Sequence, residues 1–114
     1  MTLLAVAVLL YAGPASGCAL TLGNTELICD SLTIQRGRDD QTEFTANSGR
    51  KALRLVARCP TKTVCEVVQV ARDGAAAKAE GVCRLTLDGN EINELDCRSY
   101  SAFGELEMRM WPSR

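Results

Sequence analysis

The chain has 114 residues, six of them cysteine and none histidine, and its 13 basic residues nearly balance its 14 acidic residues. This length suffices for one small domain and not for two. The balanced charge, with no basic block and no basic stripe interleaved with aromatic residues, argues against nucleic acid as a partner.

The chain opens with an unbroken apolar run from Leu3 to Ala12, and Ala15-Ser16-Gly17 stands directly before Cys18. The run is too short to span a bilayer as a helix, and no later run is longer. An apolar run followed by small residues is typical of a secretory signal peptide, although no basic residue precedes this one. We therefore expect residues 1–17 to be removed and the protein to be secreted. The alternatives are a buried N-terminal strand or helix, and a bacterial lipoprotein lipidated at Cys18.

All six cysteines follow this leader, and an oxidising compartment favours a disulfide framework in so short a chain. Each disulfide then contributes about 2–4 kcal/mol, a large part of the net stability. Five residues separate Cys59 from Cys65, and among them Pro60 and three polar residues provide the turn that a bond between the cysteines requires. We expect a structural element, a disulfide-closed turn and then a strand.

The first part of the mature chain is expected to consist of short strands and polar connections. Residues 19–29 form an extended pair around Gly23-Asn24, and residues 32–34 alternate as a half-buried strand. Residues 35–41 form a polar loop. Its two arginines and two aspartates either line a binding rim or pair with one another on the surface. Residues 45–49 are the next polar connection.

The middle of the chain offers one helix. The apolar residues of 53–59 fit one face of a helix and one face of a strand equally well, but the leucine, alanine, lysine and arginine content favours a helix that begins near Arg50. Residues 64–71 are rich in β-branched residues and indicate a strand. Residues 72–81, which contain Gly74 and Gly81, are expected to form a connection.

The end of the chain returns to strands. Residues 83–87 alternate, Asp88-Gly89-Asn90 predicts a tight turn, and residues 92–97 form the last strand of the cysteine framework. In the tail, residues 98–114, three apolar side chains share one face and could add a strand to the sheet edge. The expected fold is α+β, a small antiparallel sheet or sandwich with one or two short helices and stabilising disulfides.

The residue types argue against catalysis and against a bound metal or other cofactor. Without histidine there is no Ser/His or Cys/His nucleophile, and no two cysteines have the two-residue spacing of a zinc site. The carboxylates lie in polar stretches, where nothing marks two of them as a desolvated acid and base. These carboxylates are Asp39, Asp40, Glu43, Asp88, Glu91 and Glu94.

Several segments match one family pattern. In residues 52–68 an apolar segment ends in Arg-Cys, and after five intervening residues a second cysteine begins a valine-rich strand. The loop Gly37-Arg38-x-Asp40 follows a short strand, and pairs of cysteines open and close the framework. In this order and spacing, residues 18–97 resemble the galactose/rhamnose-binding lectins, the sea-urchin-egg-lectin type domain also found in latrophilin-like receptors. The resemblance implies a lectin-like domain that binds a glycan or cell-surface glycoconjugate through Gly37, Arg38 and Asp40.

The resemblance also implies how the cysteines pair. By the family's pairing, Cys59 bonds Cys65 and Cys29 bonds Cys97. The two further cysteines that the family usually has are missing here. Cys18 and Cys83 therefore lack their usual partners and are expected to bond each other.

Other departures predict that the sugar site is degenerate. Ala19 replaces the family's glutamate, Arg36 replaces the loop tyrosine, and Gly81-Val82 stands where Asp-Pro is expected. The family's Lys-Tyr-Leu is also missing before Cys97. Each lost hydrogen-bond partner costs about 1–3 kcal/mol of binding free energy. The alternative function is therefore a secreted protein-interaction or inhibitor module that binds no sugar.

Overall fold

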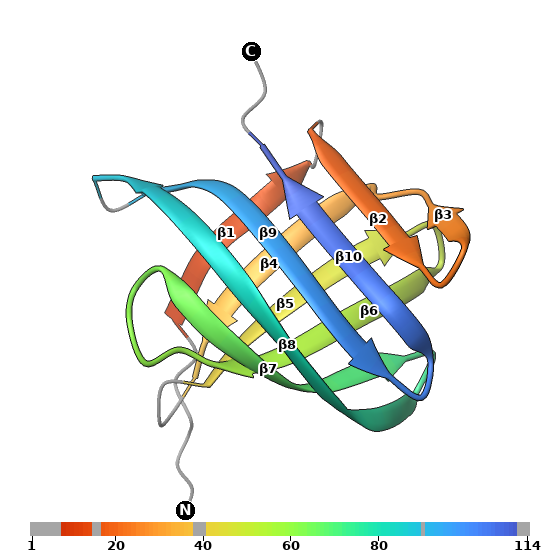
Figure 1. Ribbon diagram of the computed structural model, residues 1–114. Coiled ribbons are helices and arrows are strands. Elements are labelled where there is room, and N and C mark those ends of the chain that lie inside the picture. Colours follow the sequence, from red (N-terminus) through yellow and green to blue (C-terminus); the bar gives the residue numbers. More distant parts are fainter. Residues whose placement is uncertain (1–7, 15–16, 38–40, 90, 112–114) are drawn as a thin grey trace, which may run out of the picture.

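The computed structural model describes residues 8–14, 17–37, 41–89 and 91–111, which form a sheet of ten strands (Figure 1). Within these ranges there is no helix, so the expected α+β fold is wrong and the described part of the chain is all-β. The strands are β1 (Val8–Pro14), β2 (Cys18–Leu22), β3 (Thr25–Leu27), β4 (Ser31–Arg36), β5 (Gln41–Ser48), β6 (Lys51–Arg58), β7 (Val64–Arg72), β8 (Ala75–Asp88), β9 (Glu91–Ser101) and β10 (Gly104–Met110).

All ten strands belong to one antiparallel sheet in the order β1-β4-β5-β6-β7-β8-β9-β10-β2-β3. The sheet curls over itself, so that β4, β5 and β6 lie behind β8, β9 and β10 (Figure 1). Val68 of β7 is skipped in the pairing with β6 and also in the pairing with β8, so the register of β7 shifts there relative to both neighbouring strands. Such bulges bend a strand and increase its twist, which explains why the sheet turns over at β7 and β8.

The curled sheet encloses a single apolar core. Inward-pointing residues alternate with outward-pointing ones along β4, β5 and β10, as the period of two requires. In β4 and β5 these residues are Leu32, Ile34 and Phe44, all completely buried, and Leu20 and Met108 are completely buried on the opposing strands. The core therefore lies between the two halves of one sheet.

The segment expected to be a helix is strand β6. Leu53, Leu55 and Ala57 are buried against the core, while Arg54 and Arg58 are exposed. Both edges of β6 are hydrogen-bonded, to β5 and to β7. Pairing on both sides outweighs the modest helix propensity of its leucine, alanine and arginine residues.

Residues 72–81 are not the expected connection. Asp73 has a φ of 49° and Gly74 a φ of 86°, the two positive values that a two-residue type I′ turn requires. The turn leads directly from β7 into β8, a strand that continues through Gly81. The turn predicted around Gly89 is present, while Asn90 lies outside the described residues. The polar connection expected at residues 45–49 is instead largely part of β5.

The apolar residues of the tail do form a strand. Leu106, Met108 and Met110 of β10 are buried in the core. However, β10 lies in the interior of the sheet, between β9 and β2, and not at an edge. Residues 98–101 belong to β9.

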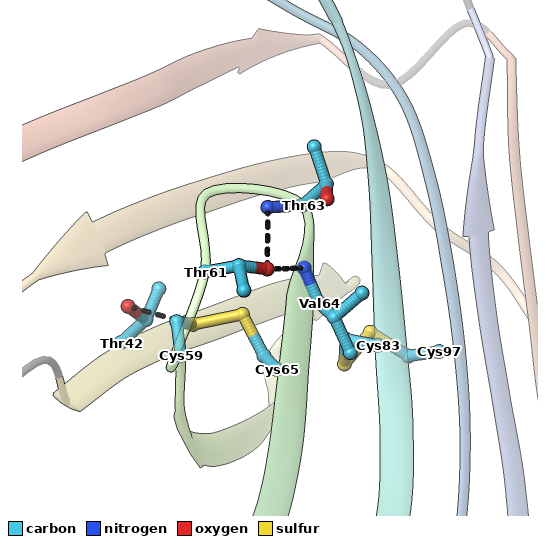
Figure 2. Close-up of a disulfide and its surroundings, with 8 residues drawn as sticks. All are labelled: Thr42, Cys59, Thr61, Thr63, Val64, Cys65, Cys83 and Cys97. Atoms are coloured by element: carbon cyan, nitrogen blue, oxygen red, sulfur yellow. Dashed lines mark hydrogen bonds between the residues drawn. A yellow bond between two sulfur atoms is a disulfide. The ribbon is translucent and has the colours of Figure 1, made fainter.

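All six cysteines form disulfides. Cys59 is bonded to Cys65, as expected, and this bond closes the turn between β6 and β7 (Figure 2). The expected Cys29–Cys97 and Cys18–Cys83 bonds are wrong, because the structure contains Cys18–Cys29 and Cys83–Cys97 instead. The register explains one correction: Cys83 and Cys97 lie directly opposite each other on β8 and β9.

Hydroxyl groups support the Cys59–Cys65 turn (Figure 2). Thr61 Oγ1 accepts hydrogen bonds from the backbone N–H of Thr63, at 3.3 Å, and of Val64, at 3.1 Å. The buried hydroxyl of Thr42 lies 3.3 Å from Cys59 Sγ. The hydroxyl is the donor there, because a disulfide sulfur carries no proton.

Candidate binding groove

The loop expected to hold a sugar connects β4 to β5. Gly37 is exposed, and its N–H donates a 2.7 Å hydrogen bond to the carbonyl oxygen of Gln41 across the base of the loop. Arg38 and Asp40 lie outside the described residues. The sequence prediction for these three residues therefore remains a prediction.

A groove with a cavity volume of about 390 Å³ lies beside the base of this loop, and we call it the outer groove. It crosses the outward face of β4, β5, β6 and β7 and ends at the β7–β8 turn. Gln35 and Glu43, which line it, are paired directly across β4 and β5, and each lies three residues from the nearer end of segment 38–40. The outer groove and the predicted sugar-binding loop are thus adjacent along the chain.

Small side chains make the outer groove hollow. Ala71 lies opposite Arg54 of β6 on one side and opposite Ala76 of β8 on the other. Ala52 and Ala75 complete this set of alanines. Because an alanine side chain ends at Cβ, neighbouring longer side chains stand above these positions and form the walls.

The walls are polar and carry balanced charge. Arg54 Nη1 lies 3.5 Å from Glu43 Oε1, and Arg72 Nε lies 3.6 Å from Asp73 Oδ2. All four side chains are between 38% and 48% exposed. Ion pairs exposed to this extent contribute only about 0–1 kcal/mol each, so a ligand can replace them at low cost. Thr45, directly opposite Arg54, adds a hydroxyl group.

A smaller cavity of about 40 Å³ adjoins the outer groove near β2 and β3, and we call it the apolar notch. Three leucines, Leu20, Leu27 and Leu53, line it. The two cavities share Ala52, Arg72 and Asp73. A ligand in the outer groove would therefore have hydrogen-bonding groups along its length and an apolar recess at one end.

The chemistry of the outer groove is that of binding by hydrogen bonds. Its arginines donate, its carboxylates accept, and Gln35 and Thr45 do both. Within the described residues, no cluster of three or more His, Cys, Asp or Glu side chains could hold a metal ion. Among the described residues that line the groove none is aromatic, so a sugar ring would not be stacked there.

Sequence reasoning missed this groove because its residues come from five strands. The sequence marks Glu43 only as a carboxylate in a polar stretch, and it favours a helix for the segment that holds its partner Arg54. The available signal was the pattern Glu43-x-Thr45 together with Asp73-Gly74, a sequence typical of hairpin turns. Only the register of β5 with β6 and β7 brings these groups together.

Comparison with protein-family models, with curated proteins and with solved structures finds no match for this chain. Among the described residues, no helix is both long enough and apolar enough to cross a membrane.

Proposed function

We propose that this chain is a secreted carbohydrate-binding module and that the outer groove is its binding site. The observation that carries the proposal is the line of hydrogen-bonding side chains from Gln35 and Glu43 to Arg54, set over a floor of alanines. A saccharide is recognised by several converging hydrogen bonds, and this groove offers them. The volume also falls in the range of about 300–1,000 Å³ that is usual for small-molecule sites.

The chemistry of the groove favours a neutral glycan. The charges of Arg54 and Arg72 are balanced by those of Glu43 and Asp73. An anionic ligand would have to displace the carboxylates and leave them facing its own charge. A ligand that presents hydroxyl groups can accept from the arginines and donate to the carboxylates at the same time.

Secretion is supported by the disulfides and by the leader. All six cysteines are bonded, which is compatible with an oxidising compartment. We propose that the segment 1–17 is removed as a signal peptide before the protein reaches the outside of the cell. Gly37, Arg38 and Asp40, which the resemblance implies as sugar-binding residues, are proposed to contribute further hydrogen bonds to the sugar.

A protein-interaction module is the second candidate, and one surface favours it. Val68, Val82 and Tyr100 are exposed on three neighbouring strands, β7, β8 and β9, at 39%, 39% and 64% respectively. Exposed apolar and aromatic side chains of this kind are common in protein interfaces. None of the three lines the outer groove, so the two candidates can be separated by mutation.

A glycan array probed with the secreted protein tests the proposal. Wild type is expected to bind neutral glycans, and Arg54→Ala to bind them at least about tenfold more weakly, which corresponds to about 1.4 kcal/mol. Arg84→Ala is the matched control, because Arg84 is an exposed arginine on β8 outside the groove. Wild type that binds no glycan while Tyr100→Ala weakens a protein complex would favour the second candidate.

A further inference from the structure

We infer that removal of the leader exposes the edge of β4 and that a second copy of this chain covers it, by antiparallel pairing of β4 with β4. The inference rests on the leader removal proposed above, but not on the identity of the ligand. Its first support is the position of β1. Residues 8–14 belong to the apolar leader, and they pair with β4 along its whole length, from Val8 opposite Arg36 to Pro14 opposite Ser31.

The leader and the strand that covers β4 are thus the same segment. Cleavage before Cys18 removes β1 and leaves the other nine strands. β4 then becomes an edge strand whose outer backbone N–H and C=O groups have lost their partners. Leu32 and Ile34, completely buried in the full chain, also come to lie at an open edge.

The two edges of the remaining sheet differ in how well they are protected. The far edge, β3, has only three residues, and one of them is the exposed acid Glu26. Short length and charge are two of the ways in which proteins prevent edge-to-edge pairing. β4 has six residues and contains no proline, lysine or acid, and its one charge is Arg36 at its end. Once uncovered, β4 is therefore the edge that pairs with another strand.

The sequence of β4 is complementary to itself. Thr33 of one copy is placed directly opposite Thr33 of the second copy, across a two-fold axis. In this register, residues that lie opposite each other also point to the same face of the joined sheet. Leu32 then faces Ile34 of the second copy, and Ser31 faces Gln35. One step further, Asp30 faces Arg36 of the second copy, so opposite charges meet at both ends. Apolar, threonine and opposite-charge pairs of this kind each stabilise an antiparallel sheet.

This symmetry is the reason for choosing a second copy as the occupant. An isologous pair uses the same patch on both subunits, and here one short strand supplies both halves of every cross-strand pair. The pairing would also extend the sheet of one copy into that of the other. The outer groove meets the new contact only at Gln35 of β4, and its other lining residues lie on β5, β6, β7 and β8 and in the β7–β8 turn, away from the joined edges.

The test uses the protein as it is secreted. Intact mass first identifies the N-terminus, and native mass spectrometry and light scattering then give the oligomeric state. A product that begins at Cys18 and is a dimer is expected. Thr33→Lys places two like charges opposite each other at the two-fold axis and is expected to weaken the dimer at least about tenfold. Thr86→Lys, an exposed threonine of β8, is the control that leaves the dimer intact.

Hydrogen exchange keeps the test decisive if the Thr33→Lys variant is poorly produced. In the dimer the amides of β4 that point outward are expected to be protected, and a synthetic peptide of residues 8–14 is expected to compete with the second copy. A secreted product that retains residues 8–14, a monomer with unprotected β4 amides, or a dimer unaffected by Thr33→Lys would each overturn the inference. A complex with another protein at β4 would overturn the choice of occupant. Glycan binding by a monomeric product would leave the proposed function standing.

Discussion

Cys83 and Cys97 face each other across β8 and β9, with their Cα atoms 4.0 Å apart and both residues completely buried. On the other side of Cys83, Cys65 lies directly opposite on β7, and its side chain is 1% exposed. Three half-cystines therefore stand in register on three neighbouring strands (Figure 2). They cross-link the place where the sheet turns over, and they pack there as part of the apolar core.

Removal of the Cys83–Cys97 bond is expected to be the most damaging loss of a disulfide. The double variant Cys83→Ala/Cys97→Ala should lower the free energy of unfolding by about 3–5 kcal/mol, because chain entropy is released and a core cavity forms. The control is Cys18→Ala/Cys29→Ala. That bond spans a similar sequence separation, 11 against 14 residues, but its cysteines are only partly buried. Urea denaturation measures the free energy of unfolding of both double variants. Equal losses of stability would show that the burial of Cys83 and Cys97 adds nothing to the contribution of their bond.

Gly81 is expected to tolerate no side chain. A Cβ added there would collide with the carbonyl oxygen of Arg98 and lie 2.6 Å from the Cβ of Ser99 on β9. Gly81→Ala should therefore destabilise the fold by about 1–3 kcal/mol through overpacking. Gly37→Ala is the matched control, since the nearest atom of the described residues to a Cβ at that position is the Gln41 oxygen at 3.7 Å. Thermal unfolding of the two variants compares them, and a neutral Gly81→Ala would contradict the close approach of β8 and β9.

Filling the outer groove is expected to abolish glycan binding without unfolding the protein. Ala76 is exposed on the floor of the groove, so a tyrosine there occupies space that the ligand needs and does not enter the core. Ala76→Tyr should lose at least about 90% of glycan-array signal, a tenfold effect. Ala102→Tyr, at an exposed position of the β9–β10 turn, should bind like wild type. Full binding by Ala76→Tyr would place the site elsewhere.

Glycan binding should depend little on salt. Each arginine that lines the groove is paired with a carboxylate, so the site presents no net charge to a neutral ligand. Between about 0.05 and 0.5 M salt, affinity is expected to change less than about twofold, although screening shortens from roughly 14 Å to 4 Å. Isothermal titration calorimetry at both concentrations measures this. A steep fall in affinity would indicate an acidic ligand.

The sequence predicted the strands best where β-branched residues alternate, as in β7 and in the later part of β8. It misassigned β6 because eight residues satisfy both helical and extended periodicities, and only hydrogen bonding on both edges decides between them. It missed the first part of β8 because alanine and glycine have low strand propensity, while Gly81 is required there by close contact with β9.

The disulfides and the groove show the same limit. The spacing of Cys59 and Cys65 predicts their bond because the turn between them is local. The partner of Cys83 depends on the register of β8 with β9, which no local pattern fixes. The same holds for Glu43 and Arg54, which meet only because β5 and β6 pair in one particular register and expose both side chains on the outward face.

The most direct test of the central claim is a nuclear magnetic resonance titration of the isotope-labelled secreted protein with neutral oligosaccharides that end in galactose or rhamnose. If the outer groove binds the sugar, the backbone amide signals of Thr45, Arg54 and Ala71 shift together, along with those of the β7–β8 turn. If no signals shift, or if they shift only around Val82 and Tyr100, the groove is not a carbohydrate site.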